Sequence, residues 1–328
     1  MPARPPKTIL LTGSSGWLGR FLAPQLNAAG YRVIGLDVAA GTHTTVVGSV
    51  AHRPLIDQVF ADYGIEAVIH GAALHKPDIV RYPKQAFVDV NITGTLNLLE
   101  AAIAAGHDRF VFTSTTSLMI SAEVRAGSQG GATKAFWLDE DFGPIQPRNI
   151  YGVTKFAAEN TCHLFAANHG LDIAILRTGR FFPEEDDTLT SPSGPNLKAN
   201  EFLNRRLTVA DAAASHRAAL EGISGKGCRT YILSAPTPFN PDDAEALVVD
   251  APSVIARYFP AAKVLYAAKG WVLPSYIDRV YDASKIEREL GFRPRVSFST
   301  ILDALETGSP LPYHHDPKYT SPKERGVG

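Results

Sequence analysis

The chain has 328 residues, of which 45% are apolar and 20% are charged, and its formal net charge at pH 7 is -1. A chain of this length can bury a substantial core, so we expect one large domain with a smaller lobe. The nearly neutral charge argues against nucleic acid and against an anionic membrane surface as partners, because proteins that bind either of them carry a basic excess.

The chain has no apolar run as long as the ~18 residues of a membrane-spanning helix. Residues 1–7 pass directly into a predicted strand without the apolar block of a signal peptide. We therefore expect a cytoplasmic protein. Cys162 and Cys228 lie far apart and show no metal-ligand spacing, which favours free thiols in a reducing compartment and predicts no metal site.

The first predicted strand, residues 8–11, leads into a glycine-rich turn and then into a predicted helix. Glycine permits the positive φ of a tight turn and lets the backbone approach a pyrophosphate, whose charge the helix N-terminus stabilises. Tight turns of other kinds also use glycine, so this motif needs support from other elements. The residues expected to hold a dinucleotide here are Gly13, Ser15, Gly16, Trp17, Leu18 and Gly19.

A second predicted strand, residues 31–36, ends in Asp37. This position is close to the offset of ~20 residues at which an acidic side chain accepts hydrogen bonds from the adenosine ribose of a bound dinucleotide. Asp37 would repel a 2′-phosphate on that ribose. The sequence therefore favours NAD over NADP as the cofactor.

A third predicted strand is buried and ends on the small residues Gly71, Ala72 and Ala73. Side chains larger than methyl would collide with a dinucleotide lying across this strand end, although packing against a helix would also explain small residues. His75 follows in a loop at the carboxyl edge of the predicted sheet, where open α/β sheets bind their ligands. His75 is therefore a candidate substrate residue.

Residues 88–102 are predicted to form one long amphipathic helix. Residues 110–117 are predicted to form a strand whose last five residues, 113–117, all carry hydroxyls. These hydroxyls either point donors into the crevice or make local backbone hydrogen bonds. Residues 121–134 are polar and glycine-rich and predict an insertion loop, for which a flap over the site is one role.

The next predicted helix carries Tyr151 and Lys155 four residues apart, on one face and one turn apart. A phenol with an ordinary pKa of ~10 is a poor base near neutrality. A neighbouring ammonium group stabilises the phenolate and lowers that pKa, and the positive nicotinamide ring of NAD would add to the effect. Such pairs are common on helix surfaces. This one predicts catalysis because it follows a phosphate-binding turn, a ribose carboxylate and a hydroxyl-ended strand.

A further buried strand, residues 171–177, precedes Arg180. The guanidinium of an arginine can grip a carboxylate or phosphate through two parallel hydrogen bonds, and internal pairing with Glu184 or Glu185 is the alternative for Arg180. Residues 191–200 are predicted to form a loop. Later in the chain, the sequence predicts a strand at residues 228–234 and a proline-rich, charged tail.

The glycine spacing, the pair Tyr151 and Lys155, and the run from residue 282 to residue 294 together resemble one superfamily. This is the short-chain dehydrogenase/reductase superfamily, in its extended branch of NAD-dependent epimerases and dehydratases. The resemblance implies an α/β fold, a Rossmann-like doubly wound parallel sheet with a smaller C-terminal substrate-binding lobe. The expected segments are a dinucleotide-binding domain (7–178 with 207–236), a substrate-binding lobe (179–206 with 237–307) and a flexible tail (308–328).

The same resemblance implies roles for single residues. Tyr151 would be the general base or acid on the substrate hydroxyl, and Lys155 would tune it and hold the nicotinamide ribose. Tyr151 and Lys155 are both expected to contact the cofactor. Thr115 matches the catalytic serine or threonine of the family and would share the substrate oxygen, with Ser114 as the fallback. The expected substrate contacts are His75, Ser114, Thr115, Thr116, Arg180 and Arg279.

The residues after Thr115 indicate which reaction to expect. Dehydratases and decarboxylating members of the family place a carboxylate there, whereas this chain has Thr116 and Ser117. We therefore expect hydride transfer on a sugar-like secondary alcohol by a nucleotide-sugar epimerase that uses NAD. The alternative is a dehydrogenase that releases NADH from a free sugar acid or small polyol, which Arg180 favours. A catalytically silent NAD-binding protein is a third class, and the resemblance also implies a homodimer.

Overall fold

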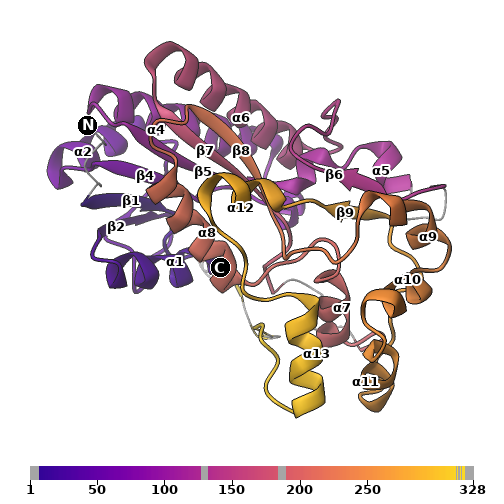
Figure 1. Ribbon diagram of the computed structural model, residues 1–328. Coiled ribbons are helices and arrows are strands. Elements are labelled where there is room, and N and C mark those ends of the chain that lie inside the picture. The colour runs from indigo at the N-terminus through magenta and orange to yellow at the C-terminus, as the bar shows by residue number, and fades with distance from the viewer. Residues whose placement is uncertain are drawn as a thin grey trace.

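The computed structural model describes most of the chain, namely residues 7–126, 132–183, 190–314, 316, 318, 320 and 321. Within them, the main sheet has seven strands in the order β3-β2-β1-β4-β5-β7-β8, and every pair is parallel (Figure 1). The strand order reverses between β1 and β4, and open α/β sheets bind their ligands outside the carboxyl ends of the strands at such a point. The predicted fold class is confirmed. The strands are β1 (Thr8–Thr12), β2 (Arg32–Asp37), β3 (Val46–Val47), β4 (Ala67–His70), β5 (Arg109–Thr115), β7 (Asp172–Thr178) and β8 (Cys228–Leu233).

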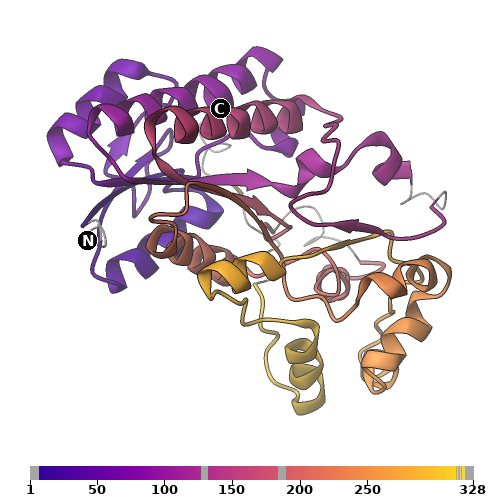
Figure 2. The same ribbon diagram turned by 45° about the horizontal axis from the view of Figure 1, so that its top comes forward.

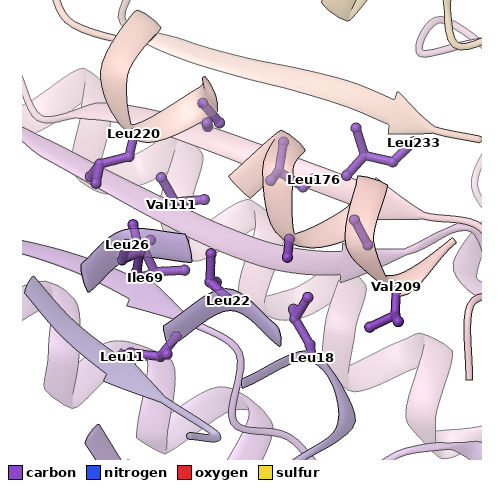
Figure 3. Close-up of a cluster of buried hydrophobic side chains, with 14 of the residues drawn as sticks. Leu11, Leu18, Leu22, Leu26, Ile69, Val111, Leu176, Val209, Leu220 and Leu233 are labelled. Carbon is purple, nitrogen blue, oxygen red and sulfur yellow. The ribbon is translucent and has the colours of Figure 1, made fainter. Parts of the chain in front are cut away.

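One face of this sheet is covered by α1 (Trp17–Ala28) and α8 (Val209–Gly222), which also pack against each other. Their apolar side chains form a buried core with alternating strand residues such as Leu11 and Ile69 (Figure 3). A parallel sheet that is covered on both faces needs apolar residues on both sides of each strand. The β1 sequence meets this requirement, because all five of its residues are buried.

The opposite face carries α2 (Arg53–Tyr63), α4 (Gly94–Ala104) and α6 (Ile150–His169) (Figure 2). These helices bury a second core against the other strand side chains, among them Leu10 and Val68. None of the helices in the described part of the chain combines the length and the apolarity that a bilayer crossing needs.

A second group of helices lies to the lower right of the sheet in Figure 1 and has an apolar core of its own. It is joined to the main sheet by a small parallel sheet of two strands, β6 (Phe136–Leu138) and β9 (Arg279–Tyr281). Sequence analysis predicted neither of these short strands. The helices of the group are α7 (Gly194–Glu201), α9 (Ala244–Val249), α10 (Ala251–Tyr258), α11 (Ala262–Ala268) and α13 (Phe298–Thr307), and α12 (Ser284–Leu290) packs near β8.

The segment 191–200, predicted as a loop, contains α7. Ser193 caps this helix, because its hydroxyl accepts a hydrogen bond from the backbone N–H of Asn196. Pro195 lies in the first helical turn, where the N–H that proline lacks would have no intrahelical partner. The loop prediction is therefore wrong for this segment.

Two other predicted segments differ in part from the structure. The predicted helix 88–102 is divided into a π-helical segment, η2 (Val88–Thr93), and the α-helix α4. The predicted insertion loop 121–134 begins with a short helix, α5 (Ala122–Ala126). Residues 127–131, in the middle of this segment, lie outside the described part of the chain, so the flap expected at 121–134 stays a prediction.

Part of the expected flexible tail is packed. Gly308 ends α13 with a φ of 69°, and Leu311 and Tyr313 then pack on the core of the second helix group. The expectation of a flexible tail from residue 308 onward does not hold for these residues, because the apolar face of α13 and its neighbours offers them a buried surface.

Candidate active site

The turn between β1 and α1 is so compact that two of its glycines cannot be replaced by residues that carry a side chain. Gly13 has a φ of 77°, and a Cβ added there would lie 2.9 Å from the backbone nitrogen of Ala72. A Cβ added to Gly19 would overlap the carbonyl oxygens of Gly13 and Ser14. Glycine is therefore required at both positions by close backbone contacts, with the end of β4 at Gly13 and with the turn after β1 at Gly19.

Three further residues of the motif form the start of α1. Gly16 is its N-cap residue, in extended conformation, and Trp17 and Leu18 are its first residues. The Trp17 and Leu18 side chains are buried in the core, so these two residues would meet a ligand through their backbone. The N–H groups of a first helical turn have no intrahelical partner and attract anions.

Asp37 lies at the end of β2 beside this turn. Its Oδ2 atom accepts a hydrogen bond of 3.0 Å from the Ser15 N–H, and its Oδ1 atom accepts one of 3.0 Å from the Ala39 N–H. The Ser15 hydroxyl is buried, and the described residues supply no partner for it. Leaving a buried hydroxyl unpaired costs free energy, so a phosphate oxygen is a fitting acceptor. The residues of the turn therefore fit a dinucleotide.

A buried network holds the small-residue end of β4. The Thr12 hydroxyl lies 2.7 Å from Nδ1 of His70 and accepts a hydrogen bond from the Ala72 N–H, while Nε2 of His70 lies 3.1 Å from the Thr95 hydroxyl. Burial, followed by the charge of Lys155, lowers the pKa of His70 well below its usual value. A neutral His70 thus supports the half-buried predicted cofactor residues Gly71, Ala72 and Ala73.

Tyr151 lies in the first turn of α6 and is only 7% exposed. The Asn149 side chain caps this helix by accepting a hydrogen bond of 2.9 Å from the Gly152 N–H. The Tyr151 ring packs with Leu74, and its centroid lies 5.9 Å from that of His75. The structure therefore brings the predicted general base and a predicted substrate residue together.

Lys155 follows one turn later on the same face and is 2% exposed. Its Nζ atom lies 3.9 Å from the ring centroid of Phe112, a cation–π contact from β5. Burial lowers the pKa of Lys155 to about 7, against the smaller opposing effects of Cys162 and Glu159. Lys155 is therefore poised to change its protonation state near neutral pH.

The Lys155→Met substitution is expected to raise the free energy of unfolding at neutral pH. The unfolded chain binds more protons than the folded one between about pH 7 and the ordinary lysine pKa of 10.5. The destabilisation of the unaltered protein by the buried Lys155 charge is therefore fully present below pH 7 and fades toward pH 10.5. At about 1.4 kcal/mol per pKa unit, the gain at neutral pH should reach several kcal/mol. Urea unfolding at neutral and at alkaline pH measures it.

The matched control for this substitution is Lys263→Met, at an exposed position of α11. It should change the unfolding free energy little at either pH, because its ammonium group is solvated in both states. An equal gain for Lys155→Met at neutral and at alkaline pH would contradict the assignment of the effect to a buried charge.

The hydroxyls at the end of β5 diverge in their contacts. Ser114 donates a hydrogen bond of 2.6 Å to Glu159, and Thr116 donates one of 3.1 Å to the Thr178 carbonyl. The Thr115 oxygen instead accepts a hydrogen bond of 3.1 Å from the Ser117 N–H, so its own proton can still be donated. The geometry favours Thr115 over the fallback Ser114 as the partner of a substrate oxygen.

Glu159 is a buried residue that was not among those predicted from the sequence. It lies on α6 one turn beyond Lys155 and is 1% exposed. Arg177 of β7 pairs with it, at 2.8 Å from Nη2 to Oε2 and 3.1 Å from Nε to Oε1. The spacing of Tyr151, Lys155 and Glu159 at four-residue intervals was the signal that could have revealed this third member of the row.

The predicted substrate arginines are both paired within the protein. Arg180 contacts Glu201 at 2.8 Å, and Arg279, which is buried, contacts Asp278 at 2.5 Å. The expected alternative partners of Arg180, residues 184 and 185, lie outside the described residues. Substrate contacts by these arginines therefore stay predictions.

A sequence model of the NAD dependent epimerase/dehydratase family matches residues 9–205 of the chain. A UDP-glucose 4-epimerase of Rhizobium meliloti is 33% identical over 176 residues, which are 52% of this chain and 50% of that protein. The matches to the first curated relatives thus span about half of their length. An uncharacterized protein of Sinorhizobium fredii, y4nG, is 31% identical over 329 residues, covering 90% of this chain and 77% of that protein. A solved UDP-glucose 4-epimerase of Thermotoga maritima with UDP-glucose shares the fold, with a TM-score of 0.62, 20% identity and coverage of 92% and 99%.

Proposed function

Because the chain belongs to the NAD-dependent epimerase/dehydratase family, we propose that it is an NAD-dependent epimerase of a nucleotide-linked sugar. The observation that carries the proposal is the placement of Tyr151 and Lys155 on one buried face of α6, with His75 beside the phenol. The similarity to UDP-glucose 4-epimerases supports the substrate class. Thr116 and Ser117 supply no carboxylate for elimination, which supports epimerisation over dehydration.

The cofactor would supply a site that accepts a hydride from a substrate carbon and returns it to the opposite face. Asp37 would accept hydrogen bonds from the adenosine ribose hydroxyls. Ser15 and the backbone N–H groups at the start of α1 would donate to the pyrophosphate. Gly71, which has no side chain, and Ala72, which has only a methyl group, would leave room for the dinucleotide.

Proton transfer would fall to Tyr151. Its phenol oxygen would take the proton of the substrate hydroxyl and later give it back. A charged Lys155 would stabilise the phenolate form, because an opposite charge nearby favours ionisation. Thr115 would donate its hydroxyl proton to the same substrate oxygen and keep it in position.

The decisive experiment incubates the purified protein with UDP-glucose and analyses sugar nucleotides and NADH together. Formation of UDP-galactose without accumulation of NADH, on protein that keeps NAD through purification, would support the epimerase. Release of NADH from a panel of free uronates and polyols, with no conversion of UDP-glucose, would replace it by the dehydrogenase alternative. If neither reaction occurs and NAD does not bind, the enzyme proposal is rejected.

Asp37→Asn is expected to reduce the preference for NAD over NADP. The substitution keeps an oxygen that can accept the Ser15 or Ala39 hydrogen bond but removes the charge that strengthens bonds to ribose hydroxyls and repels a 2′-phosphate. We expect NAD affinity to fall about tenfold, with a smaller loss or a gain for NADP. Calorimetric titration with each dinucleotide measures both constants.

Asp57→Asn is the matched control, because Asp57 is an exposed carboxylate of α2 that pairs with Arg53. It should leave both dissociation constants unchanged. An unaltered ratio of NAD to NADP affinity in Asp37→Asn would show that Asp37 does not face the ribose.

A further inference from the structure

The chain after α13 turns back toward the cofactor-binding turn. Helix α13 lies beside α7 (Figure 1), and the segment that follows it, residues 311–314, runs across α7 to the start of α1. We call this segment the C-terminal strap. Its residues contact both the second helix group and the nucleotide-binding helix, and the proposed function assigns it no role.

At α7, the strap is held by packing and by two hydrogen bonds. The Tyr313 ring stacks on Phe202, with 5.4 Å between ring centroids, and its hydroxyl donates a hydrogen bond of 2.7 Å to the Pro195 carbonyl. The Lys198 ammonium group donates one of 3.2 Å to the His314 carbonyl. Lys198 is only 1% exposed, so the strap supplies an acceptor to a buried cation.

At α1, the strap ends on the residues that follow the glycine turn. The His314 ring lies 4.9 Å from the Phe21 ring and 6.2 Å from the Trp17 ring, nearly perpendicular to the latter. Trp17 is the first residue of α1, so its own N–H belongs to the set proposed to hold the pyrophosphate. A contact on Trp17 therefore acts on the position of that helix start.

Trp17 also connects to the catalytic residues. Its indole N–H donates a hydrogen bond of 3.0 Å to the Phe181 carbonyl, and the Phe181 and Phe182 rings stack at 4.4 Å. The Phe182 ring lies 5.2 Å from His75, whose ring lies 5.9 Å from Tyr151. A continuous series of ring contacts and one hydrogen bond thus connects the strap to Tyr151, the proposed general base.

We propose that Tyr313 and His314 are positioning residues that hold the substrate lobe against the cofactor-binding turn. This inference rests on the proposed function, because it assumes that the turn binds NAD. Groups fixed in their bound geometry lose less entropy when a ligand binds, so the strap should favour binding of NAD and substrate. It touches no reacting atom and should alter the maximal rate much less.

The test compares NAD affinity in four variants by calorimetry on protein freed of nucleotide. A chain that ends at Pro310 lacks the strap, and a chain that ends at Ser321 keeps it and serves as the control. His314→Ala removes the ring that contacts Trp17 and Phe21, and His314→Phe restores an aromatic ring there. We expect the dissociation constant of NAD to rise about tenfold in the chain that ends at Pro310 and in His314→Ala, and to recover in His314→Phe.

The same variants are assayed for KM and kcat with UDP-glucose. KM should rise several-fold and kcat should stay within about threefold, a split that general loss of folded protein would not produce, since that lowers kcat alone. If the chain that ends at Pro310 does not fold, His314→Ala carries the test alone. Unchanged NAD affinity in the variants that fold would overturn the role of the strap and leave the proposed function intact. Absence of NAD binding to the unaltered chain would reject both.

Discussion

Replacing Tyr151 by phenylalanine should lower turnover about 10²- to 10⁴-fold, the range typical for loss of general acid–base catalysis. The substitution removes only the phenol oxygen, while the ring keeps its packing against Leu74 and Phe87 in the first turn of α6. Initial rates of UDP-glucose conversion measure the loss.

The affinity for NAD should change little in this variant, within about threefold, because most of the cofactor contacts proposed above come from the glycine turn and Asp37. The control is Tyr231→Phe, which removes the phenol oxygen of a β8 residue that donates a hydrogen bond to Glu289 of α12. It should leave turnover close to that of the unaltered chain. Full activity in Tyr151→Phe would remove Tyr151 from the mechanism.

Glu201→Gln should destabilise the fold by about 3–5 kcal/mol, the cost of breaking a buried ion pair by removing one partner. Glu201 is 2% exposed, and its carboxylate lies 2.7–2.8 Å from the guanidinium groups of Arg180, Arg205 and Arg206. A neutral amide would leave these cations without the charge that compensates them. Urea unfolding at pH 7 measures the difference in unfolding free energy.

The destabilisation should also depend on pH. Burial opposes ionisation of Glu201, but the charges of Arg205, Arg206 and Arg180 outweigh it and lower its pKa from 4.5 to about 2. A folded-state pKa below the unfolded value gives stability that is fully present above about pH 4.5 and is lost as the pH falls toward 2. The difference in unfolding free energy between the unaltered chain and Glu201→Gln should therefore become smaller as the pH falls from about 4.5 to 2.

Glu287→Gln is the control for a carboxylate that pairs at the surface. Glu287 contacts Arg293 at 3.0 Å, and both side chains are well exposed, so its replacement should cost less than about 1 kcal/mol. If Glu201→Gln lowered the unfolding free energy no more than Glu287→Gln does, the account of the buried arginine cluster would be contradicted. A difference from the unaltered chain that stays the same in acid would contradict it as well.

Much of the candidate site followed from the sequence because it depends on spacing within short segments. The glycines at 13 and 19 are required by the turn itself, Asp37 ends a strand, and Tyr151 and Lys155 share a helix face at a separation of four residues. The alternation of strands and helices likewise predicted the parallel sheet, because the period at which apolar residues recur in a segment indicates whether it forms a helix or a strand.

Several local predictions failed where a contact from elsewhere in the chain decides the structure. The segment 191–200 was predicted as a loop, but it forms α7, whose buried face packs in the second helix group. The tail after Gly308 was expected to be flexible, but Tyr313 finds a stacking partner in Phe202. The composition of a segment cannot show that it will pack on a surface formed by residues more than a hundred positions away in the sequence.

The sequence by itself determined the fold class, the glycine turn after β1 and the shared face of Tyr151 and Lys155 on α6, since each of these is encoded in the order of neighbouring residues. Only the tertiary structure decided which charges meet. It paired Glu159 with Arg177 and gathered three arginines around Glu201, and it left Thr115 rather than Ser114 with a proton to donate. Ion pairs and hydrogen bonds depend on distances of a few ångströms, and packing sets those distances between segments that the sequence keeps apart.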